Sequence, residues 1–213
     1  MSEQISKLGT EASIAELYAE GLRYFMGEGK LNKALGRLSS ELMEHGIDYV
    51  VFDDAALLAH GYPRFTEGID LVMTAEGLEK FHNELVGLGY SPAFPGARKR
   101  LRSTIDNVSI EVMLSGEYPG DGKPKPVSMP IPSAASEEID GTKFVTLEKL
   151  IELKLASGIS AGDRLKDLAD VQELIKIKKL DATFAERLDP YVRTKFIELQ
   201  SSVRSNDSNQ EQE

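Results

Sequence analysis

The chain has 213 residues, of which 41% are hydrophobic and 28% charged, fractions typical of a folded globular protein rather than a disordered one. It contains no cysteine, which excludes disulfides and thiolate metal sites and leaves oxygen and imidazole groups as metal ligands. The formal net charge of −10 disfavours non-specific binding to DNA, which needs a basic surface, but it is compatible with a local basic pocket for one nucleotide.

The sequence gives no sign of a membrane protein. No apolar run is long enough to cross a bilayer, and residues 1–6 lack the apolar stretch of a secretory signal. We therefore expect a cytoplasmic protein with no membrane partner.

Two amphipathic helices are predicted near the N-terminus, after a polar and flexible segment at residues 1–12. Apolar residues recur at helical spacing in residues 14–25 and 31–42, and Gly27 and Gly46 mark the ends of the two runs. Their apolar stripes are more simply explained as core than as a surface for a partner.

The stretch that follows predicts a strand, a helix and a second strand. Residues 49–52 form a short apolar run of aromatic and β-branched residues, which suits a buried strand. Asp53 or Asp54 can cap a short helix at residues 55–59, because a carboxylate accepts from the free N–H groups of a first turn. Residues 69–73 then read as the next strand.

Further elements follow at regular intervals. A helix is expected between Thr74 and Gly89, and strands at residues 98–105 and 108–114 are joined by a hairpin signal. In the second of these strands apolar and polar residues alternate, so Glu111 points away from the core.

Residues 115–126 are rich in glycine and proline and form a loop. The loop is either a plain connector or a flap that contacts a substrate, since long loops often carry function. Short strands are expected after it, at residues 127–129 and 143–145.

The remainder of the chain is predicted to be helical. Amphipathic patterns begin at Thr146 and continue through residues 163–177 and 184–199, whereas the polar tail from Ser201 favours disorder. The fold class is therefore α/β (α+β), with a small mixed sheet flanked by helices. The expected organisation is a flexible N-terminus (1–12), an α/β core (13–145), a C-terminal helical segment (146–200) and a disordered tail (201–213).

Two separated groups of residues resemble a known family. The first group consists of Val50-Val51, Ala55, His60-Gly61-Tyr62-Pro63-Arg64, Thr66 and Ile69-Asp70-Leu71, and the second lies in residues 153–171. In this order they resemble the nucleotidyltransferase superfamily, which has the DNA polymerase β-like fold. The resemblance is to small bacterial members related to abortive-infection (AbiEii-type) nucleotidyltransferases.

The resemblance implies Mg²⁺-dependent transfer of a nucleoside monophosphate from a nucleoside triphosphate (NTP) to an acceptor hydroxyl. Positioning and charge neutralisation dominate such a reaction, and carboxylates on adjacent strands hold the metal. On this basis Asp70 and Glu111 are the metal ligands and catalytic carboxylates, and Arg64 and Lys154 contact phosphate. The resemblance does not fix the acceptor, which is a protein, an RNA, a small molecule or nothing at all.

The chain departs from the family at the centre of this site. The family has a Gly-Gly or Gly-Ser turn where this chain has Asp53 and Asp54, and it has a carboxylate where this chain has Gly68. Two acids in the phosphate turn oppose triphosphate binding, because like charges repel and side chains block the backbone N–H groups. The changes therefore favour weak or absent activity.

Three interpretations of these departures are open. The protein is a non-catalytic member of the family, or an active enzyme in which Asp53 or Asp54 replaces the ligand missing at Gly68. Alternatively, only the fold is shared and the chain is a binding or toxin–antitoxin module.

Other charged residues allow two interpretations each. Arg64 either clamps phosphate or pairs with Glu67, and Lys154 either faces the nucleotide or is a surface lysine. The Lys166, Asp167 and Asp170 group has the one-turn spacing of a structural ion-pair set.

A run of basic residues at Arg98, Arg100 and Arg102 is the one basic cluster that could serve a polyanion, although a solvated strand face explains it more simply. The three histidines, His45, His60 and His82, do not have metal-ligand spacing.

Overall fold

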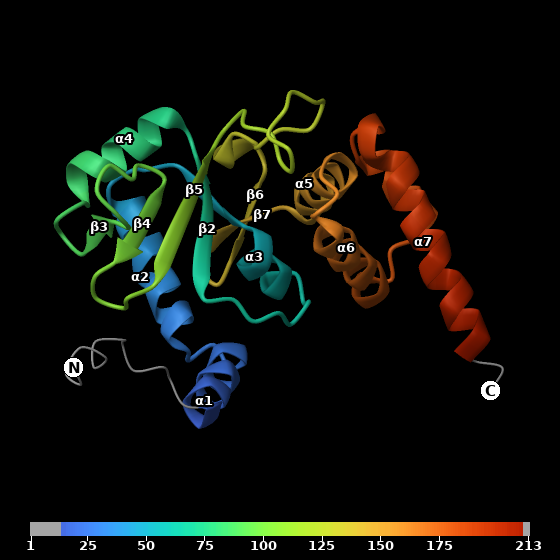
Figure 1. Cartoon of the computed structure of the whole chain (residues 1–213), viewed down its shortest axis with the longest axis horizontal. Coiled ribbons are helices and arrows are strands. Elements are labelled where there is room, and N and C mark those ends of the chain that lie inside the picture. The colour runs from blue at the N-terminus through green and yellow to red at the C-terminus, as the bar shows by residue number, and fades with distance from the viewer. Residues whose placement is uncertain (1–13, 211–213) are drawn as a thin grey trace, which may run out of the picture.

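The computed structural model describes residues 14–210, and its centre is a mixed sheet (Figure 1). Within this range the sheet has seven strands in the order β3-β4-β5-β2-β1-β7-β6. The strands are β1 (Tyr49–Phe52), β2 (Gly68–Met73), β3 (Tyr90–Pro92), β4 (Arg100–Ser103), β5 (Ser109–Leu114), β6 (Ser136–Ile139) and β7 (Thr142–Val145). The helices are α1 (Ile14–Phe25), α2 (Lys30–Glu44), α3 (Asp53–Ala59), α4 (Ala75–Glu84), α5 (Leu147–Ser160), α6 (Leu165–Lys178) and α7 (Pro190–Gln210), with 3₁₀ turns η1 (Pro132–Ala134) and η2 (Ala182–Arg187).

The central strands β1, β2 and β5 fix the positions of the carboxylates Asp70 and Glu111. β2 runs antiparallel to β1 and parallel to β5, and in this register Asp70 lies opposite Glu111. Side chains alternate between the two faces of a strand. In β2, Ile69 and Leu71 are buried on one face, while Gly68 and Asp70 lie on the other and are half-buried.

Helices pack on the sheet and beside it. α2 and α4 both contact β2, whereas α5, α6 and α7 contact one another and form a helical group next to the sheet (Figure 1). Amphipathic spacing explains the packing of α7, whose buried residues recur every three to four positions: Val192, Phe196, Leu199 and Val203.

The structure confirms the predicted fold class, a mixed α/β arrangement with helices around the sheet and a helical C-terminal part. Two strands were not predicted. β6 (Ser136–Ile139) is polar and lies at the edge of the sheet, and β3 (Tyr90–Pro92) has only three residues and contains a proline. Edge strands need only one buried face, so their sequences carry a weak apolar signal.

Two other segments differ from the sequence prediction. Residues 127–129 are not a strand, although Met129 exchanges backbone hydrogen bonds with Gly116 and Glu117. Helix α7 continues to Gln210, so residues 201–210 are helical where disorder was predicted, because Val203 still packs on the core. The segments predicted to be flexible at residues 1–12 and disordered at 211–213 lie outside the described residues.

None of the helices within residues 14–210 combines the length and the apolar character needed to span a bilayer.

Candidate active site

A cavity of about 230 Å³ lies where the open face of the sheet meets helix α5 and the loop at residues 115–126. Carboxylates and cations line it together with apolar side chains. The polar lining residues are Asp53, Asp70, Glu111, Ser157, Lys154, Arg164 and Asp167, and the others are Phe52, Met113, Tyr118, Pro119, Gly120, Met129, Leu150 and Leu153. Residues from the sheet, from the three helices α3, α5 and α6, and from the connecting loops therefore meet in one pocket.

Asp70 and Glu111 form a pair of carboxylates on neighbouring parallel strands. Burial raises the pKa of the Asp70 carboxyl to about 7, and the nearby charges of Asp53 and Glu111 add to the rise. Glu111 is more open, with a side chain 49% exposed and 3.5 Å from the guanidinium of Arg100. The pair thus concentrates negative charge at one side of the cavity.

The turn between β1 and α3 brings a third carboxylate to the cavity. Asp53 has a φ of 56°, a left-handed conformation that glycine adopts most easily and that aspartate tolerates better than most residues. Its Oδ1 accepts a hydrogen bond of 2.5 Å from Lys154 Nζ. Burial acts to raise the pKa of the Asp53 carboxyl, but the Lys154 ammonium outweighs burial and lowers it.

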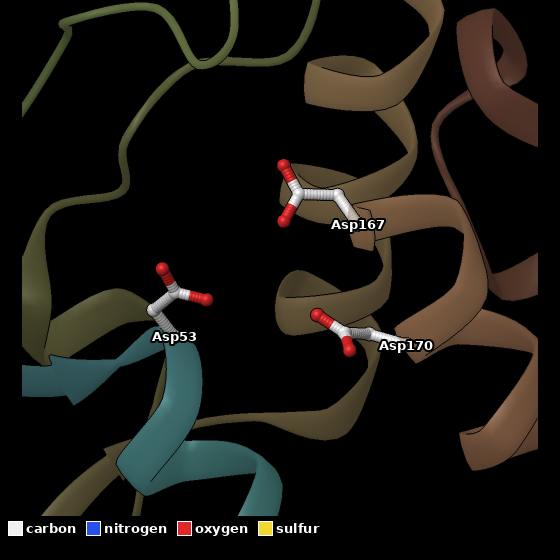
Figure 2. A group of neighbouring side chains, drawn as sticks. All are labelled: Asp53, Asp167 and Asp170. Atoms are coloured by element: carbon white, nitrogen blue, oxygen red, sulfur yellow. The ribbon is translucent and has the colours of Figure 1, made fainter. Parts of the chain in front are cut away.

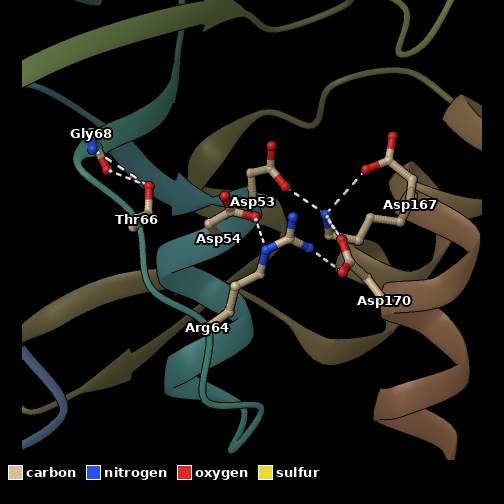
Figure 3. A network of polar contacts seen from close by, with 8 residues as sticks. Asp53, Asp54, Arg64, Thr66, Gly68, Asp167 and Asp170 are labelled. Carbon is tan, nitrogen blue, oxygen red and sulfur yellow. Dashed lines mark hydrogen bonds and ion pairs between the residues drawn. The ribbon is translucent and has the colours of Figure 1, made fainter. Parts of the chain in front are cut away.

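Lys154 is the centre of an ionic network with Asp53, Asp167 and Asp170, the three of which are labelled in Figure 3. It is only 4% exposed, and its ammonium lies 2.5 Å from Asp53, 2.8 Å from Asp170 and 3.3 Å from Asp167. Burial opposes the charge, yet the three carboxylates raise the pKa of Lys154 above its usual value. This burial excludes the interpretation of Lys154 as a surface lysine.

The same three carboxylates have the arrangement of a cation site (Figure 2). Oxygens of Asp53, Asp167 and Asp170 lie within 4.8 Å of one another. Because the Lys154 ammonium donates to all three, the position that a metal ion would take among them is already occupied by a side chain.

Arg64 joins the same network from the segment that follows α3 (Figure 3). Its Nε is 3.2 Å from Asp54 Oδ1, and its Nη1 donates to Asp170 Oδ1. Neither Arg64 nor Asp54 lines the cavity. Burial, together with the charge of Asp53, raises the pKa of Asp54. Arg64 therefore pairs with these two aspartates, and the structure records no pairing with Glu67 among the described residues.

Gly68 leaves an open position beside the carboxylate pair. It lies opposite Ser109 in the register of β2 and β5, two residues before Asp70 and on the same face. A Cβ at this position would lie 2.9 Å from Ser109 Oγ. Gly68 does not line the cavity, so of the five positions expected at one acidic cleft the structure brings together Asp53, Asp70 and Glu111.

Sequence analysis did not assign Asp167, Asp170 or Arg164 to the site. The available signal was the i, i+3 spacing of two aspartates on α6, whose other buried residues are apolar: Val171, Leu174 and Ile175. Arg164 is exposed at the cavity and, within residues 14–210, has no ion-pair partner. It is therefore the cation of this pocket that a bound anion can reach without displacing a carboxylate.

Comparison with known proteins gives only distant similarities. No protein-family model and no curated protein sequence matches the chain. The solved structure of ANT(2″)-Ia in complex with adenylyl-2″-tobramycin has a TM-score of 0.49 at 13% identity, covering 83% of this chain and 97% of that one.

Two other solved structures are similar at comparable levels. An antigenic nucleotidyltransferase-like protein from Paracoccidioides brasiliensis has a TM-score of 0.45 at 17% identity, covering 70% of this chain and 76% of its own. A putative nucleotidyltransferase from H. pylori has a TM-score of 0.44 at 17% identity, covering 94% and 98%. Because these scores are low, the function must be argued from the residues of the cavity.

Proposed function

We propose that the cavity is a nucleotidyl-transfer site that binds an NTP with Mg²⁺, and that its transfer activity is weak in this chain. The observation that carries the proposal is the meeting of Asp70 and Glu111, on adjacent strands, with Asp53 at the helix-bearing turn and with two cations, Lys154 and Arg164. Carboxylates for a metal and cations for phosphate are the groups that nucleotidyl transfer needs.

The carboxylate pair suits a hard divalent cation. All of its donors are oxygens, which Mg²⁺ prefers. Burial, and after it the charges of Asp53 and Glu111, raises the pKa of Asp70 to about 7, and a bound cation would offset both effects. Asp70 and Glu111 would hold Mg²⁺ in this pocket, and the metal would supply neutralisation of phosphate charge. Asp53 is near enough to raise the pKa of Asp70 and can therefore add a third oxygen.

The cations in and beside the pocket have different roles in this proposal. Arg164 is open to the cavity and would contact the phosphates directly with its forked donors. Lys154 also lines the pocket but is held by its three aspartates, so it would neutralise their charge rather than bind phosphate directly. Arg64, assigned to phosphate from the sequence, binds Asp54 and Asp170 instead and would position α6.

Two features support low activity. The Asp53 carboxylate occupies the turn where phosphate would approach backbone N–H groups, and position 68 has no carboxylate. If activity remains, Asp53 is the better substitute ligand, because it lines the cavity and Asp54 does not. The second candidate function is a non-catalytic binding or toxin–antitoxin module, which the same departures favour.

Calorimetry with the four NTPs and Mg²⁺ tests binding. We expect binding by the natural chain that weakens at least tenfold in Asp70→Asn and in Glu111→Gln, since each loses one proposed metal ligand. Glu138→Gln, on the exposed edge strand β6, is the matched control and should bind normally. A chain that binds no Mg²⁺–NTP would contradict the proposal.

Pyrophosphate release separates transfer from binding alone. The assay should offer acceptor hydroxyls of three classes: protein, RNA and small molecules. We expect release well below that of a competent transferase. Fast pyrophosphate release that is lost in Asp53→Asn would instead support an active enzyme in which Asp53 replaces the ligand missing at Gly68. Nucleotide binding with no pyrophosphate release would support the non-catalytic module.

A rescue variant tests the cause of the low activity. Asp53→Gly removes the acid from the turn and suits its positive φ, and Gly68→Asp supplies the missing carboxylate. Ser109→Ala is needed with them, because the new Cβ at position 68 would otherwise meet Ser109 Oγ. We expect the triple variant to bind Mg²⁺–NTP more tightly than the natural chain. Unchanged affinity would show that these positions do not limit binding.

A further inference from the structure

The loop at residues 115–126 forms part of the wall of the cavity that also contains the carboxylate pair. Tyr118, Pro119 and Gly120 line the pocket. The start of the loop is fixed to the segment after it, since Gly116 N donates to Met129 O at 2.9 Å and Met129 N donates to Glu117 O at 2.7 Å. The loop is therefore held in place where it enters the pocket.

The centre of the loop is docked on helix α5. Gly120 comes so near that a Cβ there would lie 2.8 Å from the backbone oxygen of Ser157. Gly120 also has a φ of 72°, a conformation that side chains rarely adopt. Only glycine permits this approach, so the loop is positioned against the same helix that carries Lys154.

Lys125 orders the loop from within. Its side chain is 6% exposed although the surrounding segment is polar. Its ammonium donates to Pro119 O at 2.7 Å and to Asp121 Oδ1 at 2.6 Å, and it lies 5.9 Å from the centroid of the Tyr118 ring. A cation at this distance attracts an aromatic ring and restrains its orientation. Tyr118 is thus a half-buried ring with a fixed place in the cavity wall.

The cavity has a charged part and an apolar part. Glu111 and Met113 lie on the same face of β5, two residues apart, so the strand advances roughly 7 Å between them. Met113 lines the cavity together with Met129 and Tyr118, which gives it an apolar wall. The carboxylates and cations also line it, together with the apolar residues Phe52, Leu150 and Leu153. A nucleoside triphosphate has the same division between a charged triphosphate and a planar, largely apolar base.

We propose that Tyr118 is the ring on which the nucleobase stacks, and that Lys125 is the residue that positions Tyr118. The inference rests on the proposed function, because it assigns the base half of the same nucleotide. Stacking on an aromatic face tolerates every base, since each has a π-face. Tyr118 would therefore raise affinity for nucleotides over other polyphosphates without selecting strongly among bases.

The absence of tryptophan from the chain allows a direct test. Tyr118→Trp introduces a single fluorophore at the wall of the cavity, and Tyr191→Trp introduces one on α7, away from the cavity, as the matched control. We expect Mg²⁺–ATP to quench Tyr118→Trp but not Tyr191→Trp. Mg²⁺ with inorganic tripolyphosphate, which has no base, should quench neither.

Affinities measured by calorimetry complete the test. Tyr118→Ala should lower affinity for Mg²⁺–ATP about tenfold and leave that for tripolyphosphate unchanged, whereas Tyr118→Phe should stay within about twofold of the natural chain. Lys125→Met should reduce ATP affinity in the same selective way, and Lys125→Arg should restore it.

The outcomes separate this inference from the function on which it rests. Normal ATP affinity in Tyr118→Ala, or equal losses for ATP and tripolyphosphate, would overturn the role of Tyr118 and leave the nucleotide site intact. Failure of the natural chain to bind any Mg²⁺–NTP would overturn both.

Discussion

At the scale of one residue, the buried carboxyl group of Asp70 lowers the stability of the folded protein once it is ionised. Its pKa rises from 3.8 to about 7 on folding because the carboxyl is buried beside other acids. The folded state therefore binds the proton more tightly than the unfolded state between these two pH values. Stability falls as pH rises through this window, and above pH 7 the ionised group costs about 4 kcal/mol.

Asp70→Asn should consequently stabilise the protein at pH 8. Asparagine cannot ionise, so the variant avoids the cost, and its melting temperature should exceed that of the natural chain by several degrees. The difference should shrink as pH falls below 7 and disappear near pH 4. Thermal unfolding of both proteins in EDTA at several pH values measures it. A difference in melting temperature that is independent of pH would mean that the pKa of Asp70 does not rise on folding.

At the same scale, Asp53 combines a left-handed backbone with a charged side chain. Its φ is 56°, a conformation that glycine adopts most easily, although the side chain there is a carboxylate. The ion pair with Lys154 accompanies this strained conformation.

At the scale of elements, one lysine joins three of them. Lys154 of α5 contacts Asp167 and Asp170 of α6 and Asp53 at the start of α3. A buried charge that loses its partner is costly, because the carboxylates would remain without compensation. The association of the helical group with the sheet therefore depends on this ammonium.

Lys154→Met should lower the free energy of unfolding by about 3–5 kcal/mol in urea denaturation. Lys176→Met is the matched control on α6, where an exposed pair with Glu173 should contribute less than about 1 kcal/mol. Because Lys154→Met leaves three converging carboxylates, added Ca²⁺ should stabilise it more than the natural chain. Equal stability of Lys154→Met and the natural chain would show that the network is dispensable.

The loop at residues 115–126 offers a second prediction at this scale. Gly120 and Gly122 have nearly the same φ, 72° and 70°, so alanine carries a similar backbone cost at either site. Only at Gly120 would the new Cβ collide, 2.8 Å from Ser157 O, whereas nothing lies within 4 Å at Gly122. Gly120→Ala should therefore destabilise by about 1–3 kcal/mol more than Gly122→Ala, as measured by urea unfolding. Equal losses of stability in the two variants would mean that the structure of the loop does not depend on its contact with α5.

At the scale of the whole molecule, charge decides which partners are excluded. The formal net charge is −10, and the arginines of the basic run are each engaged: Arg98 with Glu79, Arg100 with Glu111 and Arg102 with Asn107. A partnered guanidinium has less charge to offer a phosphate backbone, so this run is a solvated strand face.

We expect no binding of a labelled 20-mer DNA duplex at 150 mM KCl up to about 10 µM protein, as followed by fluorescence polarisation. Non-specific binding requires the release of counterions by a basic surface, which a formal net charge of −10 disfavours. Binding that weakens steeply with salt and is lost in Arg102→Glu would contradict this expectation.

The sequence by itself determined the fold class, most of the helices and the central strands, because burial of one face imposes a regular apolar spacing on each. Alternation in residues 108–114 also indicated that Glu111 points away from the core, whereas Asp70 was assigned only by the family resemblance. A short edge strand such as β6 stayed hidden, since none of its four residues is fully buried and the sequence therefore shows no apolar pattern.

Only the tertiary structure decided which charges meet. Lys154 and Asp53 are 101 positions apart, and Arg64 and Asp170 are 106 apart, so no local spacing could pair them. Their contacts depend on how the helical group docks against the sheet. The same docking engages Arg64 with aspartates and leaves Arg164 open to the cavity.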